Sequence, residues 1–328
     1  MNLTKNFKQL SKKDVSIAGG KGASLGEITR AGMPVPPGFV VLAGAFERFL
    51  EETNIAADIE AILKKVNHKD VNSVDKASAE IRRIILDEKI PVDIQSEIME
   101  SLTLLTTPHP TLSRKGRGGH TDQFFAVRSS ATAEDSKTAS WAGELETYLN
   151  VTEKNILTSV KKCWSSLFTP RAIFYRFEKK LHKNKVSVAV VVQKMVQSEI
   201  SGISFTVHPV TKDYGQMVIE AGLGLGEAIV GGMITPDTYI IHKNDFSILD
   251  INVSEQSFAI VKTASGKNIN KKLSKAAGGK QKLTGKQIVE LAKICKNIEK
   301  HYKHPQDIEW AYQKGQFYIT QSRPITTL

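Results

Sequence analysis

The sequence has few cysteines and no long apolar run. Cys163 and Cys295 are the only cysteines among its 328 residues, and their spacing matches no metal or redox motif. The longest apolar stretch, 186–192, is much shorter than the roughly 20 residues that a transmembrane helix needs. The first twenty residues also lack a secretory signal pattern. These absences favour a cytoplasmic protein with reduced thiols and no membrane partner.

The excess of basic residues is concentrated in one segment that contains no arginine. The chain carries a formal net charge of +11, and residues 261–303 hold twelve lysines against two glutamates, a local charge of +10. Tyr302 is the only Phe, Tyr or Trp in this segment, whereas nucleic-acid sites usually combine arginine with stacking aromatics. A solvated lysine-rich face is therefore the favoured interpretation, and we expect no nucleic-acid partner.

Local patterns predict a mixed α and β chain. Apolar residues at helical spacing predict helices near 43–64, 74–104, 154–168 and 284–303. Runs of β-branched residues predict strands near 124–130, 187–196, 203–209, 217–222 and 238–243. The polar stretch after residue 196 favours a boundary between two lobes, 1–197 and 198–328. Residues 106–123 are rich in proline, glycine and basic side chains, which predicts an exposed loop within the first lobe.

A glycine-rich stretch, GGKGAS at residues 19–24, opens one predicted helix. It departs from the Walker A phosphate loop, because Gly22 follows Lys21 directly. Backbone N–H groups at a helix start can still hold an anion, with Lys21 supplying a positive charge. A plain helix-entry turn explains the pattern equally well. The second glycine-rich stretch, 222–232, indicates only a loop when taken alone.

FFAVRSS, at residues 124–130, places a charged side chain inside a predicted strand. Arg128 must be paired or must face a ligand there, because burying an unpaired charge is costly. A salt bridge to a neighbouring carboxylate is the structural alternative. The small and hydroxyl-bearing residues that follow, up to SWAGELET at 140–147, are typical of a flap over phosphates.

The stretch DIEWAYQKGQFYITQSRP, residues 307–324, predicts a terminal hairpin whose geometry depends on its turn. A two-residue turn at Lys314-Gly315 would put Glu309 and Gln321 on opposite faces. A three-residue loop would put Asp307, Glu309, Gln321 and Arg323 on one face. Only this second register forms a site, and we expect it; a solvated polar face is the alternative.

Five stretches together resemble one family. They occupy residues 19–41, 125–136, 191–211, 219–232 and 307–324. These stretches look like successive motifs of the ATP-grasp nucleotide-binding domain found in phosphoenolpyruvate synthase and pyruvate phosphate dikinase, which rifampicin phosphotransferase shares. The resemblance implies an α+β ATP-grasp fold of two lobes with the nucleotide between them. It also implies ATP and Mg²⁺ as ligands.

The resemblance assigns roles to residues of the first lobe. Lys21 and Arg128 would hold the polyphosphate of ATP and assist catalysis. Gly143 would belong to the phosphate-covering flap, which reads WAGELET where relatives usually carry FAGQ. Gln193 and Met195 would form the hinge that contacts adenine.

The resemblance also assigns roles in the second lobe. Glu220 would lie near the ribose, and Glu309 and Gln321 would ligate Mg²⁺. Arg323 would neutralise the charge that develops on the transferred group. These residue types suit phosphoryl transfer, which relies on positioning and charge stabilisation and uses Mg²⁺ held by oxygen ligands.

The functional expectation is a Mg·ATP-binding module of a phosphoenolpyruvate synthase-like phosphotransferase. In that family ATP phosphorylates a histidine on a further domain, and none of the eight histidines lies in the corresponding motif; His120 lies in loop 106–123. We therefore expect a phosphohistidine and substrate domain to act in trans. The alternatives are the ATP-binding part of a rifampicin-type phosphotransferase and a non-catalytic nucleotide-binding remnant.

Overall fold

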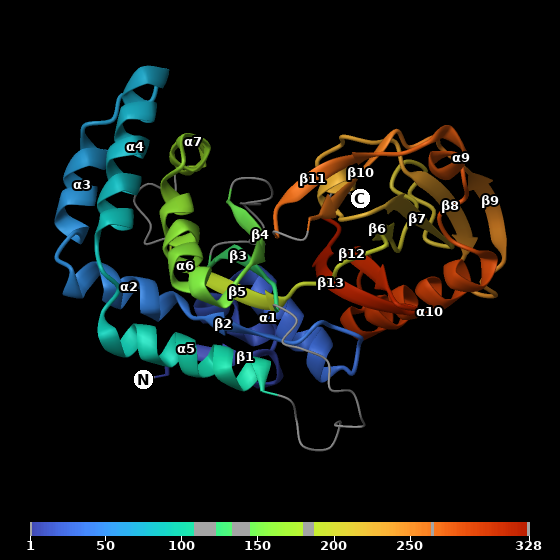
Figure 1. Cartoon of the computed structure of the whole chain (residues 1–328), viewed down its shortest axis with the longest axis horizontal. Coiled ribbons are helices and arrows are strands. Elements are labelled where there is room, and N and C mark those ends of the chain that lie inside the picture. Colours follow the sequence, from blue (N-terminus) through green and yellow to red (C-terminus); the bar gives the residue numbers. More distant parts are fainter. Residues whose placement is uncertain (1, 108–122, 133–144, 180–186, 264–265, 327–328) are drawn as a thin grey trace. The chain divides into compact units, whose positions relative to one another are not determined.

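The computed structural model describes residues 2–107, 123–132, 145–179, 187–263 and 266–326. It divides into two compact units (Figure 1). The first unit comprises residues 1–27 and 37–195, and the second comprises 28–36 and 196–328. Residues 28–36, which the sequence analysis assigned to the first lobe, thus cluster with the second unit. The mixture of helices and strands confirms the expected α+β class.

An antiparallel five-stranded sheet forms the centre of the first unit, with strand order β1-β2-β5-β3-β4. Its strands are β1 (Thr4–Asn6), β2 (Gly38–Val41), β3 (Phe125–Ala131), β4 (Thr147–Val151) and β5 (Val188–Lys194). β5 is buried along almost its whole length. β4 is an edge strand, and among the described strands it pairs only with β3.

Helices surround this sheet in the first unit. They are α1 (Val15–Arg30), whose last three residues cluster with the second unit, α2 (Ala43–Glu52), α3 (Ala56–Lys64), α4 (Val71–Asp87), α5 (Val92–Thr106), α6 (Ile156–Ser165) and α7 (Pro170–Glu178). Short 3-10 helices occupy Phe7–Gln9, Lys12–Asp14, Glu153–Asn155 and Ser166–Phe168. Trp164 of α6 is fully buried against Phe46 and Phe49 of α2, and this aromatic cluster forms part of one continuous apolar core.

Two of the predicted helices are each divided in the structure. The helix expected at 43–64 becomes α2 and α3, and the break contains Asn54 with a positive φ of 57°. The helix expected at 74–104 becomes α4 and α5, separated at Pro91. Proline fixes φ and disfavours helix before it, which explains the second break. Residues 108–122 of the predicted loop lie outside the described residues.

The second unit is built on an antiparallel six-stranded sheet with strand order β13-β12-β6-β7-β8-β9. Its strands are β6 (Ile200–Phe205), β7 (Gln216–Leu223), β8 (Asp237–His242), β9 (Ile248–Asn252), β12 (Gln306–Gln313) and β13 (Gln316–Pro324). β10 (Phe258–Lys262) and β11 (Asn268–Lys272) form a separate pair, and the helices are α8 (Glu227–Val230), α9 (Lys275–Gly278) and α10 (Gly285–Tyr302). A capping box of Thr284 and Gln287 begins α10, as the helix predicted from residue 284 requires.

A buried ion pair joins β8 to the chain that precedes α10. Lys282 Nζ lies 2.9 Å from Asp237 Oδ1, and neither side chain is exposed. Lys282 also donates to the carbonyl oxygens of Ser254 and Gly278, while the Asp237 carboxylate accepts from the Tyr239 hydroxyl and two backbone N–H groups. Both charges are therefore fully hydrogen-bonded, which is the condition under which buried charges are tolerated.

Candidate functional site

The glycine stretch, predicted to open a helix, lies inside α1 at a break in the helix, and it is docked onto β3. Gly19 has φ 67° and ψ 172°, which interrupts the helix. A Cβ at Gly19 would lie 2.2 Å from Ser130 Oγ, so only glycine fits this approach. Ser130 Oγ donates to the Ala18 carbonyl oxygen at 3.0 Å and accepts from the Gly22 N–H at 3.3 Å. One of the helix-start amides proposed to hold an anion is therefore bonded to the protein itself.

Lys21 lies half-buried in the turn that follows Gly19. A Cβ on the adjacent Gly22 would lie 3.0 Å from Val40 Cγ2, so this part of α1 covers β2. Burial raises the pKa of the Cys163 thiol to about 12, and the positive charge of Lys21 opposes that rise.

Arg128 and Gln193 lie on the same face of the first sheet. Arg128 pairs with Val191 of β5, two residues before Gln193. Directly paired residues share a face of a sheet, as do residues two apart on one strand. Val40 pairs with Val191, so the start of α1 covers this same row. The structure thus brings Lys21's helix turn, Arg128 and Gln193 together on one face.

Of the two remaining predicted residues of the first lobe, the structure describes Met195 but not Gly143. The Met195 N–H donates to the Phe124 carbonyl oxygen at 2.9 Å, directly after β5 ends. This bond fixes the chain at the point where the first unit ends. Gly143 lies outside the described residues, as do most of the residues of the predicted flap.

Glu220, Glu309 and Gln321 form one transverse row in the second sheet. Gln321 pairs with Glu309, Glu309 with Ile203, and Ile203 with Glu220. Because directly paired residues share a face, all three polar side chains emerge on one side of the sheet. Each is partly exposed, whereas the neighbouring Ile308 and Trp310 are buried on the other side.

The hairpin reaches this arrangement by a route that the sequence analysis did not predict. The expected three-residue loop is wrong, because Gln313 pairs with Gln316 across a two-residue turn. Lys314 and Gly315 have φ values of 49° and 81°, which are the positive values that such a turn requires. The register then shifts after Glu309, leaving Thr320 as an extra residue. This β-bulge brings Gln321 opposite Glu309.

An ion pair occupies the next position of the same hairpin. Arg323 Nε and Nη2 each lie 2.8 Å from Asp307 Oδ2. Asp307 is only 13% exposed and Arg323 is 40% exposed, so the carboxylate holds a guanidinium that still borders solvent. Burial raises the pKa of Glu220, and the negative charge of Asp307 raises it further. The face therefore concentrates negative charge around one anchored arginine.

The donor atoms on this face suit a magnesium ion. Glu309 and Gln321 offer carboxylate and amide oxygens from directly opposed positions, and Mg²⁺ takes oxygen ligands. Across the described part of the chain, no group of three or more His, Cys, Asp or Glu side chains forms a metal site. Two protein oxygens match an ion that completes its coordination with substrate phosphates and water.

Comparisons with known proteins identify the family of the chain. The model of the family described as "Pyruvate phosphate dikinase, AMP/ATP-binding domain" matches residues 15–328. The chain is 46% identical over 321 residues to a probable phosphoenolpyruvate synthase of Methanocaldococcus jannaschii, covering 98% of this chain and 26% of the relative. It is 41% identical over 355 residues to the phosphoenolpyruvate synthase of Pyrococcus furiosus, covering 98% of this chain and 43% of the relative.

A third relative has a different named activity. The chain is 36% identical over 329 residues to the rifampicin phosphotransferase of Bacillus subtilis, covering 100% of this chain and 36% of that protein. The chain therefore spans well under half the length of these relatives.

Among the described helices, none is both long and apolar enough to cross a bilayer.

The sequence analysis missed two contributions to these groups. Ser130 holds the glycine stretch, and the only signal for it was its place two residues after Arg128 in the strand. The Thr320 bulge had no local signal at all. The family model matches residues 15–328, which is nearly the whole chain. The chain therefore belongs to the family of pyruvate phosphate dikinase AMP/ATP-binding domains.

Proposed function

We propose that this chain binds Mg·ATP and supplies the phosphoryl donor for a phosphoenolpyruvate synthase-like phosphotransferase. The observation that carries the proposal is the row of Gln321, Glu309 and Glu220 beside the Asp307–Arg323 ion pair. Its residue types match those of a nucleotide-binding face, and the family match supports ATP as the ligand.

The chain's own residues would divide the work. Glu309 and Gln321 would hold Mg²⁺, which supplies charge neutralisation for phosphoryl transfer when bound. Lys21 and Arg128 would bind phosphate oxygens, and Gly143 would belong to the flap that covers them. Gln193 and Met195 would contact adenine, and Glu220 the ribose.

Arg323 is proposed to act on the charge of the transferred group. Its contact with Asp307 holds the guanidinium in one orientation. A fixed donor of this kind stabilises developing charge without a reorganisation cost at the moment of reaction. Asp307 is therefore a positioning residue for Arg323.

The acceptor is proposed to be a histidine on a domain outside this chain. In that step the bond from phosphorus to the leaving oxygen of ATP breaks, a phosphorus–nitrogen bond to the imidazole forms, and the shortened nucleotide leaves. The phosphoenolpyruvate synthases among the relatives support this acceptor. The rifampicin phosphotransferase supports a small-molecule final acceptor as the second candidate.

A cytoplasmic location is also proposed, because both cysteines are unpaired and buried.

Calorimetric titration with ATP, with and without Mg²⁺, tests the proposal. We expect saturable binding that requires Mg²⁺, because the proposed metal ligands and the neighbouring carboxylates repel an uncomplexed polyphosphate. Glu309→Gln keeps the side-chain shape but removes the charge that offsets the divalent ion, so affinity should fall about tenfold or more. The matched control, Asp250→Asn, removes one carboxylate from the edge strand β9 of the same sheet and should bind like the wild type. Absence of binding by the wild-type chain would refute the proposal.

A further inference from the structure

A second ionic network lies in the first unit and is centred on Glu146. Arg82 of α4 places Nη2 2.9 Å from Oε1 and 3.0 Å from Oε2 of Glu146. The Tyr148 hydroxyl donates to the same carboxylate. Burial raises the pKa of the Tyr148 phenol, and the bond to Glu146 raises it further, so the phenol stays protonated as the donor.

Glu146 connects this network to β3 through its backbone. Its carbonyl oxygen accepts from the Ser129 N–H at 3.2 Å and from Ser129 Oγ at 3.0 Å. The next residue, Thr147, pairs directly with Arg128. Glu146 thus contacts Arg82 through its side chain, and it contacts Ser129, the neighbour of Arg128, through its main chain.

β4 has limited support from its own sheet. It has five residues, it lies at the sheet edge, and its pairing with β3 is irregular between Phe125 and Val127. Unpaired edges of a short strand open at little cost. The Arg82–Glu146 contact is made at the residue directly before β4, next to the pair of Thr147 and Arg128.

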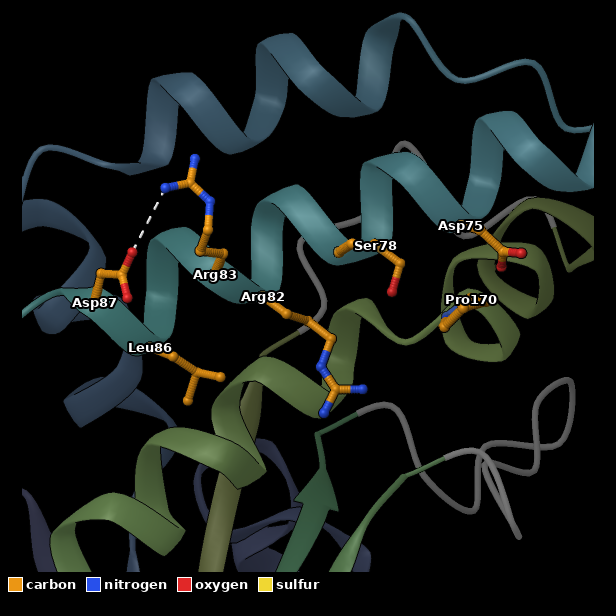
Figure 2. A pocket seen from close by; sticks show the side chains of 8 residues that line it. Asp75, Ser78, Arg82, Arg83, Leu86, Asp87 and Pro170 are labelled. Carbon is orange, nitrogen blue, oxygen red and sulfur yellow. Dashed lines mark ion pairs between the residues drawn. The ribbon is translucent and has the colours of Figure 1, made fainter.

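Arg82 is itself held on a fixed element. Lys161 of α6 donates to the carbonyl oxygens of Leu86 and Glu88 at 2.6 and 2.7 Å, which satisfies carbonyl groups at the C-terminal end of α4. Figure 2 shows Arg82 and Arg83 pointing to different sides of α4, with Arg83 joined to Asp87. Arg82 also borders a pocket of about 570 Å³, so shortening its side chain creates no closed void.

We propose that Arg82 is a positioning residue for nucleotide binding: through Glu146 it fixes β4 against β3 and thereby orients Arg128. The inference rests on the proposed function, because Arg128 is assigned there to phosphate oxygens. Arg82 has no contact with the nucleotide in this scheme and acts only through Glu146.

Two measurements on the purified chain test this inference. Hydrogen exchange by mass spectrometry or NMR reports the opening of the Ser129 amide and of β4 without any ligand. Calorimetry with Mg·ATP reports affinity. We expect Arg82→Gln to speed exchange at Ser129 and β4 and to weaken Mg·ATP affinity about threefold to tenfold. Arg82→Lys, which keeps the charge, should retain part of the exchange protection and part of the Mg·ATP affinity that Arg82→Gln loses.

Arg83→Gln is the matched control. It removes an arginine one position along α4 whose partner, Asp87, lies on the same helix at 3.6 Å with both side chains about 70% exposed. It should leave exchange and affinity at wild-type values. The double variant Arg82→Gln/Glu146→Gln should be no worse than Glu146→Gln alone, because the two side chains act through one contact.

The outcomes separate this inference from the proposed function. Wild-type exchange and affinity in Arg82→Gln would overturn the positioning role, as would an equal loss of affinity in Arg83→Gln. A lower melting temperature with unchanged affinity would also overturn it, because that result shows only structural support. If the wild-type chain binds no Mg·ATP, the proposed function fails, while the exchange data still decide whether Arg82 holds β4.

Discussion

At the scale of single residues, Glu220 carries an unfavourable charge in the folded chain. Its pKa is raised by burial and by the charge of Asp307. A carboxyl group with a raised folded pKa stabilises the fold only while it is protonated. That contribution is present below the unfolded pKa of about 4.3 and is lost as pH rises through the folded pKa. At neutral pH the ionised group is therefore a net cost to stability.

Glu220→Gln should stabilise the protein at pH 7 and weaken nucleotide binding. We expect a gain of about 0.5 kcal/mol, typical of removing a like-charge contact in a sheet. The gain should shrink as pH falls toward 4. Denaturant unfolding of wild type and variant at pH 7 and pH 4.5 measures it, and calorimetry measures Mg·ATP affinity. Glu255→Gln, at an exposed position, should change neither the free energy of unfolding nor the Mg·ATP affinity. A variant that is less stable at pH 7 would contradict the account.

At the scale of elements, the β12–β13 hairpin shows where sequence reasoning succeeds and where it stops. The strands and the polar positions follow from alternation along the chain. The turn type does not follow from the sequence, because the same residues are compatible with a two-residue turn at Lys314-Gly315 and with a three-residue loop. The bulge at Thr320 depends on which side chains pack on the far side of the sheet, and that is a tertiary property.

Deleting Thr320 tests which feature of the hairpin matters. A regular ladder across the two-residue turn would put residue 320 opposite Glu309, so removing Thr320 places Gln321 there and keeps Arg323 beside Asp307. We expect Mg·ATP affinity within about threefold of wild type, since both cross-strand pairs survive. Deleting Ser322 instead moves Arg323 to the other face and should abolish most of the affinity. Calorimetry compares the two, and loss of binding in a folded Thr320 deletion would show that the bulge itself is required.

The same contrast applies to the other elements. The α+β class and the α10 capping box are predictable because they depend on local periodicity and on adjacent side chains. The division of the 43–64 helix at Asn54 is not, because the core decides where each helix must turn. The Arg82–Glu146 contact joins residues 64 positions apart, and no local pattern encodes such a pair.

At the scale of the whole molecule, each unit has its own sheet, and the second depends on a buried charge pair. Lys282→Met keeps the bulk of the side chain but leaves the Asp237 carboxylate buried and unpaired. Such losses cost about 3–5 kcal/mol. We expect calorimetric unfolding to shift to lower temperature for the transition of the second unit.

The exposed Lys280 supplies the control for this change. Lys280→Met removes the same charge from the same segment and should shift no transition. The double variant Asp237→Asn/Lys282→Met should recover part of the loss, because it removes both charges. Equal effects of Lys280→Met and Lys282→Met would show that net charge, and not the buried pair, governs stability.

The Asp307–Arg323 pair has a consequence for the form of nucleotide that the proposed site would accept. Among the described residues, Asp307, Glu309 and Glu220 place three carboxylates near the Arg323 guanidinium. These four side chains together carry a formal charge of −2, and Arg323 is already paired with Asp307. A bare polyphosphate meets repulsion there, whereas a polyphosphate already complexed with a divalent ion brings a positive centre toward Glu309. On the proposed function, we therefore expect these residues to favour the metal complex over the free anion, so free ATP in excess over magnesium should compete poorly for the site.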